Sequence, residues 1–164
     1  MKKILILALL AAPLTMFAQK FGHVNVEEII PLMPEYTKAQ TELQNSQKEY
    51  EDELKYMNEE FQKKLQDYDA QSKTLPETTR QRREQELTEL NERMNTYAQS
   101  AEQKLQQLSA ERMAAIENKI LEAIKVVGDT GDFLYIFSNQ GQIPYIGKGS
   151  IDVTQQVKDK LGIK

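Results

Sequence analysis

Residues that could perform bond chemistry are scarce in this 164-residue chain. It has a single histidine, His23, and no cysteine, and no cluster of acids lies beside His23 in the sequence. A metal centre or an activated nucleophile would need such partners. Glycine is absent from position 23 to position 127, so the helical region contains no loop that could cradle a phosphate. The sequence therefore predicts a protein that is not an enzyme, without catalytic residues, metal or cofactor, in which His23 is structural.

The chain is better supplied with side chains for weak, adaptable contacts. Methionine is flexible and tyrosine is amphipathic, so both suit surfaces that accept varied partners. Tyr56 is the clearest candidate because it lies off the predicted helical stripe. The others lie on or near that stripe, where packing between helices is the competing interpretation. The candidates for contact with another chain are Tyr56, Met57, Phe61, Tyr68 and Leu75.

A second candidate surface is a basic cluster in the middle of the chain. Between positions 73 and 83 four basic residues stand against Glu77, a net charge of +3. They are Lys73, Arg80, Arg82 and Arg83. We hypothesise that they meet anionic groups, either acidic loops of a bound protein or lipid head groups at a membrane surface. The alternative is a solvated helix start, with Glu84 and Glu86 balancing the charge.

These side chains must be positioned by helices. Between Pro34 and Gly128 the only proline is Pro76, and glycine and proline are the strongest breaks in local structure. We therefore expect a helical hairpin over 35–127 with its tip near 72–79. Apolar residues recur every three or four positions on the outgoing helix, which indicates one amphipathic face. That stripe is Tyr36, Ala39, Leu43, Ser46, Tyr50, Leu54, Met57, Phe61, Leu65 and Tyr68.

The N-terminal segment 1–18 has the layout of a secretory signal peptide. Met1, Lys2 and Lys3 give a positive start, an apolar run follows, and Ala18 ends the segment at a small residue. We expect cleavage after Ala18, with a buried N-terminal helix as the alternative. Without residues 1–18 the chain has 19 Lys and Arg against 25 Asp and Glu, a charge of −6. A net-acidic chain disfavours nucleic acid as a partner.

The remaining segments, 19–34 and 128–164, predict a small β body. We expect strands at Phe21–Val26, 133–137 and 143–146, and a short helix that Thr154 caps. Such a body is too small for a stable core of its own, so we expect an obligate oligomer held at the strands. The candidate interface residues are Val24, Val26, Phe133, Leu134, Tyr135, Ile136 and Phe137.

Four segments resemble the Skp/OmpH family of periplasmic chaperones. The stretch from Phe21 to Ile30 looks like the family's first strand and following turn, and Pro34 to Gln40 with Leu43 like the start of its long arm. Residues 131–136 look like its late strand. The motif Asp152-x-Thr154-x-x-Val157 looks like its closing helix.

The resemblance implies an α+β homotrimer shaped like a jellyfish, with three helical hairpins around a cavity that holds unfolded outer-membrane proteins. It also implies action without ATP in the periplasm. This chain departs from the best-known members, which are basic, so electrostatic capture over the whole surface is not expected here. The alternative from another class is a coiled-coil scaffold of the cell envelope. A cytosolic prefoldin-like chaperone is disfavoured by the leader and by strands at both ends of the hairpin.

Overall fold

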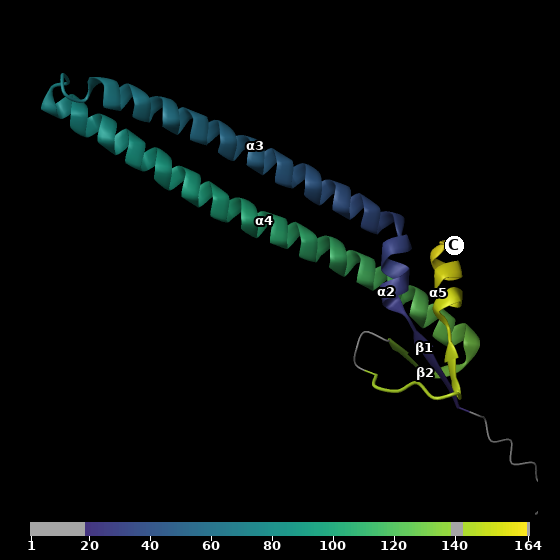
Figure 1. Ribbon diagram of the computed structural model, residues 1–164. Helices are drawn as coiled ribbons and strands as arrows, with labels where there is room; N and C mark the ends of the chain where they lie inside the picture. Colours follow the sequence, from purple (N-terminus) through teal and green to yellow (C-terminus); the bar gives the residue numbers. More distant parts are fainter. Residues whose placement is uncertain (1–18, 139–142, 164) are drawn as a thin grey trace, which may run out of the picture. The chain divides into compact units, whose positions relative to one another are not determined.

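The computed structural model describes residues 19–138 and 143–163, so the predicted signal peptide lies outside the described residues. Contacts divide the chain into two compact units. We call 19–26 with 122–162 the body, and 27–121 with Ile163 the arm. The elements in chain order are β1 (Lys20–Val24), α2 (Val26–Ile29), the 3-10 turn η1 (Ile30–Leu32), α3 (Pro34–Gln71), α4 (Glu77–Gly131), β2 (Phe133–Ser138), β3 (Ser150–Asp152) and α5 (Thr154–Leu161) (Figure 1). The predicted α+β class is confirmed.

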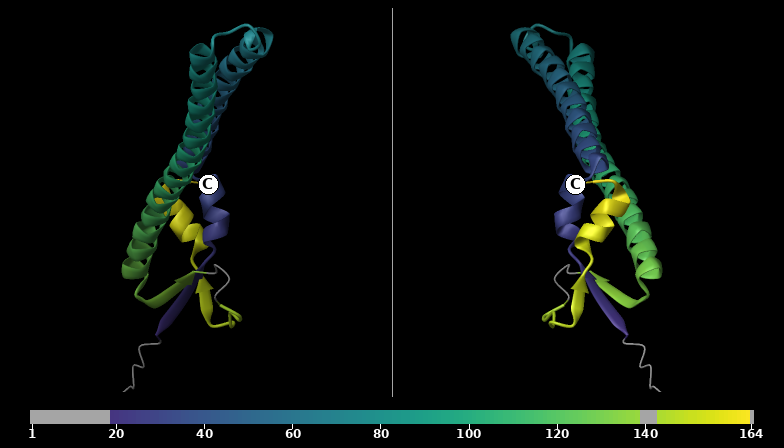
Figure 2. Two further views of the ribbon diagram at one scale, coloured as in Figure 1. Left: turned by 90° about the vertical axis from the view of Figure 1, so that its left-hand side faces the viewer. Right: turned by 90° about the vertical axis from the view of Figure 1, so that its right-hand side faces the viewer.

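Two long helices, α3 and α4, form the arm and run side by side in opposite directions (Figures 1 and 2). Pro34 is the first residue of α3, where its missing N–H costs no hydrogen bond. Residues 72–76 connect the helices, within the tip that the sequence predicts. The Leu75 N–H donates to Gln71 O at 3.1 Å, and the Arg80 N–H donates to Pro76 O at 3.0 Å. These bonds close α3 and open α4.

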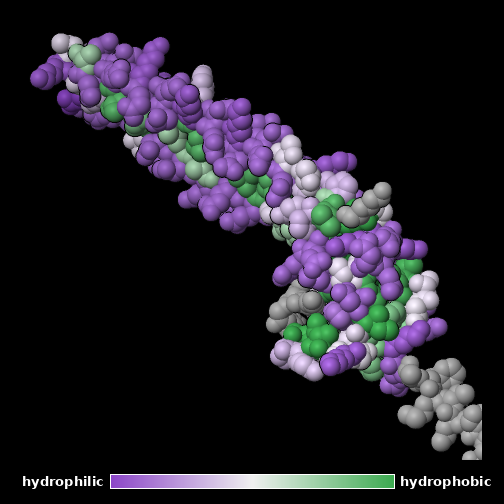
Figure 3. Space-filling model, turned by 45° about the vertical axis from the view of Figure 1, so that its right-hand side comes forward, coloured by the Kyte–Doolittle hydropathy of each residue, from purple (hydrophilic) through white to green (hydrophobic). Residues whose placement is uncertain are grey.

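The apolar stripe predicted for α3 forms the seam of the arm. Every residue of the stripe is half-buried or buried, and Ala39 is the most buried of them. From α4 the seam receives its most buried residues, Leu90, Ala101, Ile116 and Ile120. Figure 3 shows green apolar side chains in a line along the arm with hydrophilic ones on either side. The three- and four-residue spacing thus predicted the buried face correctly.

The sheet of the body has the order β2-β1-β3, and β1 pairs in parallel with both neighbours. Two predictions about it were wrong. Strand β1 ends at Val24, and Val26 begins helix α2. The third strand is Ser150–Asp152, whereas Ile143–Ile146 forms no strand. A strand needs hydrogen-bond partners, and β1 pairs with β3 on this edge instead.

The end of α4 also differs from expectation. The sequence predicts a hairpin that ends at residue 127, but α4 continues through Gly128 to Gly131. The next residue, Asp132, has a left-handed backbone with φ 53°. Aspartate tolerates this conformation better than most residues, and it turns the chain into β2. Gly162 closes α5 in the same left-handed conformation, with φ 72°.

Candidate functional site

The most conspicuous surface of the body is an aromatic face on its sheet. Phe21 of β1 lies beside Tyr135 of β2, with ring centroids 6.2 Å apart, and Tyr135 lies 5.9 Å from Phe137. All three rings are exposed, Tyr135 by 57%. We call these three residues the aromatic face. Stacked rings exposed to water are characteristic of surfaces that another protein covers.

A hollow of about 550 Å³ adjoins the aromatic face. Its walls include Phe21, Phe137 and His23 from the sheet and residues 143–147 from the following segment. Tyr145 in that segment is 79% exposed, and Leu134, Ile146 and Ile151 of the body are also exposed. Figure 3 shows apolar green patches on the body. The body therefore leaves much of its apolar surface uncovered.

The candidate interface residues divide into two groups. Leu134, Tyr135 and Phe137 are exposed, as an interface in a single chain requires. Val24 and Val26 are instead buried by the chain itself, so they are not available to a partner. The others, Phe133 and Ile136, are half-buried and lie in van der Waals reach of the Gly22 position. The sequence did not separate the groups because alternation along a strand does not say which face its own chain covers.

His23 has partners that sequence proximity did not reveal. Its Nδ1 lies 2.9 Å from Ser150 Oγ, and its Nε2 lies 3.9 Å from Asp152 Oδ2. Both partners come from β3, so the ring ties β1 to β3. The Val153 N–H reinforces this edge by donating to His23 O at 2.9 Å. These contacts fit the structural role predicted for His23.

Asp152 and Thr154 form the start of α5. The Thr154 N–H donates to Asp152 Oδ1 at 2.8 Å, and the Asn25 N–H donates to Thr154 Oγ1 at 2.9 Å. The hydrogen bond from the Thr154 side chain holds the pKa of the Asp152 carboxyl below its ordinary value of 3.8. The Thr154 N–H and His23 act in the same direction, and burial opposes them. Thr154 is thus the first helical residue and not the predicted cap.

The arm presents its candidate contact residues unequally. Tyr56 is 64% exposed, so it projects into solvent as its position off the stripe predicts. Met57 and Phe61 are half-buried in the seam. Nearby, Tyr50 of α3 meets Tyr97 of α4 edge to face, with centroids 6.1 Å apart and the planes at 74°. The packing interpretation therefore describes most of the aromatic seam, and Tyr56 remains the exposed candidate.

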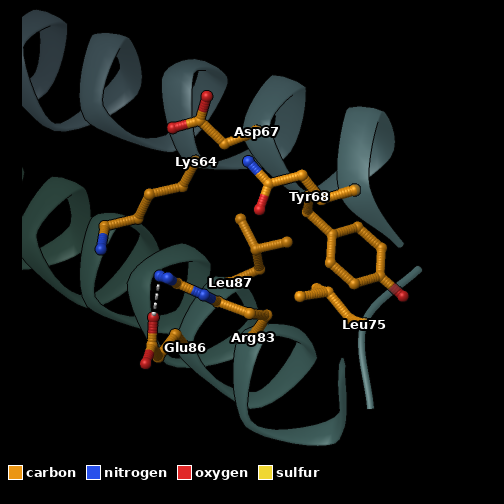
Figure 4. Close-up of a pocket in the computed structure, with 8 residues that line it drawn as sticks. Lys64, Asp67, Tyr68, Leu75, Arg83, Glu86 and Leu87 are labelled. Carbon is orange, nitrogen blue, oxygen red and sulfur yellow. Dashed lines mark hydrogen bonds and ion pairs between the residues drawn. The ribbon is translucent and has the colours of Figure 1, made fainter. Parts of the chain in front are cut away.

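At the tip, Tyr68 and Leu75 line a small hollow of about 90 Å³ together with Leu87 (Figure 4). The Tyr68 hydroxyl donates a hydrogen bond to Glu84 of α4, and this bond raises the pKa of Tyr68 above its ordinary value of 10.0. Both candidates are half-buried between the helices. Tyr68 and Leu75 thus pack the end of α3 against the start of α4, and each leaves only part of its surface exposed to another chain.

The basic cluster at the tip is largely paired. Arg80 makes ion pairs with Glu77 and Glu84. Arg82 lies 3.7 Å and Arg83 lies 3.2 Å from carboxylate oxygens of Glu86. Lys73 is exposed in the connection between the helices. These pairs favour the alternative of a solvated, charge-balanced helix start.

Two ion pairs across the arm were not found from the sequence. Arg112 Nε and Nη2 donate to the two carboxylate oxygens of Glu42, each at 2.7 Å, and Lys119 pairs with Glu35. Within one helix, Glu60 pairs with Lys64 at 3.8 Å. Ion pairs between residues four apart on a helix can be predicted from the sequence. A pair 70 residues apart can be predicted only if the alignment of α3 with α4 is known.

Within 19–138 and 143–163, no three His, Cys, Asp or Glu side chains gather closely enough to hold a metal ion. A search of the same residues finds no helix that is long and apolar enough to span a membrane. The features that remain are the aromatic face of the body and the exposed and grooved surfaces of the arm. These surfaces can bind protein chains by apolar burial.

Comparison with known proteins decides the family. The family model described as "Outer membrane protein (OmpH-like)" matches residues 20–161. The chain belongs to the OmpH-like family. It is 28% identical over 152 residues to Chaperone protein Skp of Yersinia enterocolitica, covering 91% of this chain and 92% of that one. It is 31% identical over 143 residues to Chaperone protein Skp of Photorhabdus luminescens, covering 86% and 87%.

Proposed function

We propose that this OmpH-like protein is a periplasmic chaperone that acts without ATP. It binds unfolded outer-membrane β-barrel proteins and prevents their aggregation. The names of the similar proteins support a chaperone, and the predicted signal peptide supports export. The observation that carries the proposal is the exposed aromatic face, because exposed apolar surface of this kind favours assembly, and the family resemblance implies that the assembled arms enclose a cavity.

The assembly follows from the size of the body. A three-stranded sheet is close to the smallest sheet that is stable by itself, and apolar surface removed from water contributes roughly 25 cal/mol per Å². Phe21, Tyr135 and Phe137 leave such area in water in the single chain. We infer that copies of the chain cover one another's aromatic faces. The family resemblance supports three copies.

The arms suit the proposed clients physically. Strands of a membrane β-barrel alternate apolar and polar residues, so the unfolded chain exposes apolar groups and unpaired backbone in water. Weak contacts at many points hold such a chain without fixing one conformation. Tyr56 and the partly exposed edges of Met57 and Phe61 offer these contacts on each arm. Burial alone supplies the free energy, so no nucleotide is needed.

The proposal is tested by diluting a urea-unfolded outer-membrane β-barrel into buffer with the protein lacking residues 1–18, and measuring light scattering. We expect aggregation to be suppressed without ATP, and to be suppressed less by Tyr56→Ala than by the unchanged protein. Leu121→Ala, an exposed change elsewhere on the arm, is the control. Unchecked aggregation by a protein that is still oligomeric would favour the envelope scaffold instead.

A further inference from the structure

A groove crosses the middle of the arm. It is an open hollow of about 670 Å³. Thr96 and Ser100, one helical turn apart on α4, line it with small side chains. We call the lining residues the mid-arm groove. They are Met57 of α3 and Glu89, Glu92, Arg93, Thr96, Tyr97 and Ser100 of α4.

The groove has an apolar side. Met57 and Tyr97 are half-buried, and the Tyr97 ring is held in place by its edge-to-face contact with Tyr50. Leu90, on the same helix as Tyr97, is only 1% exposed, so the seam beneath is well packed. A rigid aromatic ring next to a flexible methionine can accept apolar side chains of different shapes.

The groove also carries an excess of negative charge. Glu89 and Glu92 line it together with Arg93. Burial raises the pKa of the Tyr97 hydroxyl above its ordinary value of 10.0, and the charges of Glu53 and Glu49 raise it further. Both carboxylates of α3 therefore act on the same ring. Residues 42–60 of α3 carry seven carboxylates against two lysines, so the surroundings are acidic as well.

From this juxtaposition we propose that the mid-arm groove binds extended client segments in which a bulky apolar residue stands next to lysine or arginine. The apolar side chain occupies the hollow over Thr96 and Ser100, and the cation lies near Glu89 and Glu92. Acidic segments are repelled by the same carboxylates. This inference rests on the proposed chaperone function and adds the chemistry of the segments that it prefers.

Two labelled probe peptides test it by fluorescence anisotropy with the protein lacking residues 1–18. Both alternate leucine with polar residues, one with lysine and one with glutamate at the charged positions. We expect the lysine peptide to bind about three- to tenfold more tightly at low salt, the range that two exposed ion pairs supply. High salt should lower the ratio of the two affinities because it screens exposed charges.

Matched variants locate the effect. Glu89→Gln with Glu92→Gln should lower the ratio of the two affinities. Glu111→Gln with Glu117→Gln removes the same charge from exposed positions of α4 outside the groove and should leave the ratio unchanged. Ser100→Leu fills the hollow and should weaken both peptides. Circular dichroism checks that each variant is helical.

Equal binding of the two peptides by the unchanged protein would overturn the inference. So would equal effects of the two double variants. The light-scattering assay separates these outcomes from the proposed function. If aggregation is suppressed but the lysine peptide is not preferred, the proposed chaperone function stands and the proposed preference of the mid-arm groove is wrong. If the lysine peptide is preferred but aggregation is not suppressed, the groove binds such segments and the proposed chaperone function is wrong.

Discussion

Arg112 and Glu42 are 70 residues apart in the sequence and meet through two hydrogen bonds of 2.7 Å across the arm. The planar guanidinium matches the two oxygens of the carboxylate, so the contact fixes direction as well as distance. Lys119 and Glu35 make a second pair in the same region. Together they hold α3 and α4 in one register near the start of α3.

We predict that Arg112→Lys lowers the melting temperature of the arm slightly at low salt. Lysine keeps the charge but loses the paired geometry. The side chains of Arg112 and Glu42 are each 44% exposed, so salt should shrink the difference in melting temperature between the two proteins. Thermal melts followed by circular dichroism at two salt concentrations measure it. A difference that grows with salt would show that the contact acts by another route.

Acid should weaken the same region. The hydrogen bond from Arg112 lowers the pKa of Glu42 below 4.5, and the hydrogen bond from Lys119 lowers that of Glu35. A lowered folded-state pKa means that the stabilisation is present above the ordinary value and is lost as pH falls through the lowered one. Melting temperatures should therefore decline below about pH 4.5, and decline less for Glu42→Gln with Glu35→Gln. Parallel pH profiles for the two proteins would contradict this assignment.

Leu90→Ala should destabilise the arm by about 2–5 kcal/mol, because it leaves a cavity in the buried seam. Leu121→Ala makes the same change on the same helix at a site that is 53% exposed, and surface changes usually stay within about 0.5 kcal/mol. Urea unfolding followed by circular dichroism compares the two. Similar losses in the free energy of unfolding would mean that packing around Leu90 does not stabilise the arm.

Thr154→Val should destabilise the body by about 1–3 kcal/mol, since it removes the acceptor of the Asn25 N–H at a buried position. Thr154→Ser keeps the hydroxyl and serves as the control. Amide hydrogen exchange at Asn25 reports the loss directly. Exchange that stays slow in the valine variant would show that this hydrogen bond is dispensable.

The sequence predicted local features well and distant pairings poorly. The absence of glycine and proline identified α3 and α4, and the spacing of apolar residues identified the seam, because both are local properties. Ile143–Ile146 looked like a strand, but whether a strand forms depends on partners from elsewhere in the chain. The burial of Val24 and the pairing of His23 with Ser150 likewise depend on which strands become neighbours.

The candidate surfaces show the same limit. Tyr56 was identified because one residue off a helical stripe faces solvent whatever the partner helix does. The mid-arm groove was missed, since it requires knowing that Met57 of α3 lies opposite Thr96 and Ser100 of α4. The pairing of Arg80, Arg82 and Arg83 is local and was foreseen only as the alternative to an anion-binding tip.

We propose that copies of the chain, joined at the aromatic face, hold one unfolded chain between their arms. Native mass spectrometry of the protein mixed with a urea-unfolded outer-membrane β-barrel tests it most directly. We expect a free trimer and a complex of three copies with one client, and replacing Tyr135 and Phe137 with serine should abolish both species. A monomer that binds clients one to one, or a trimer that binds none, would contradict it.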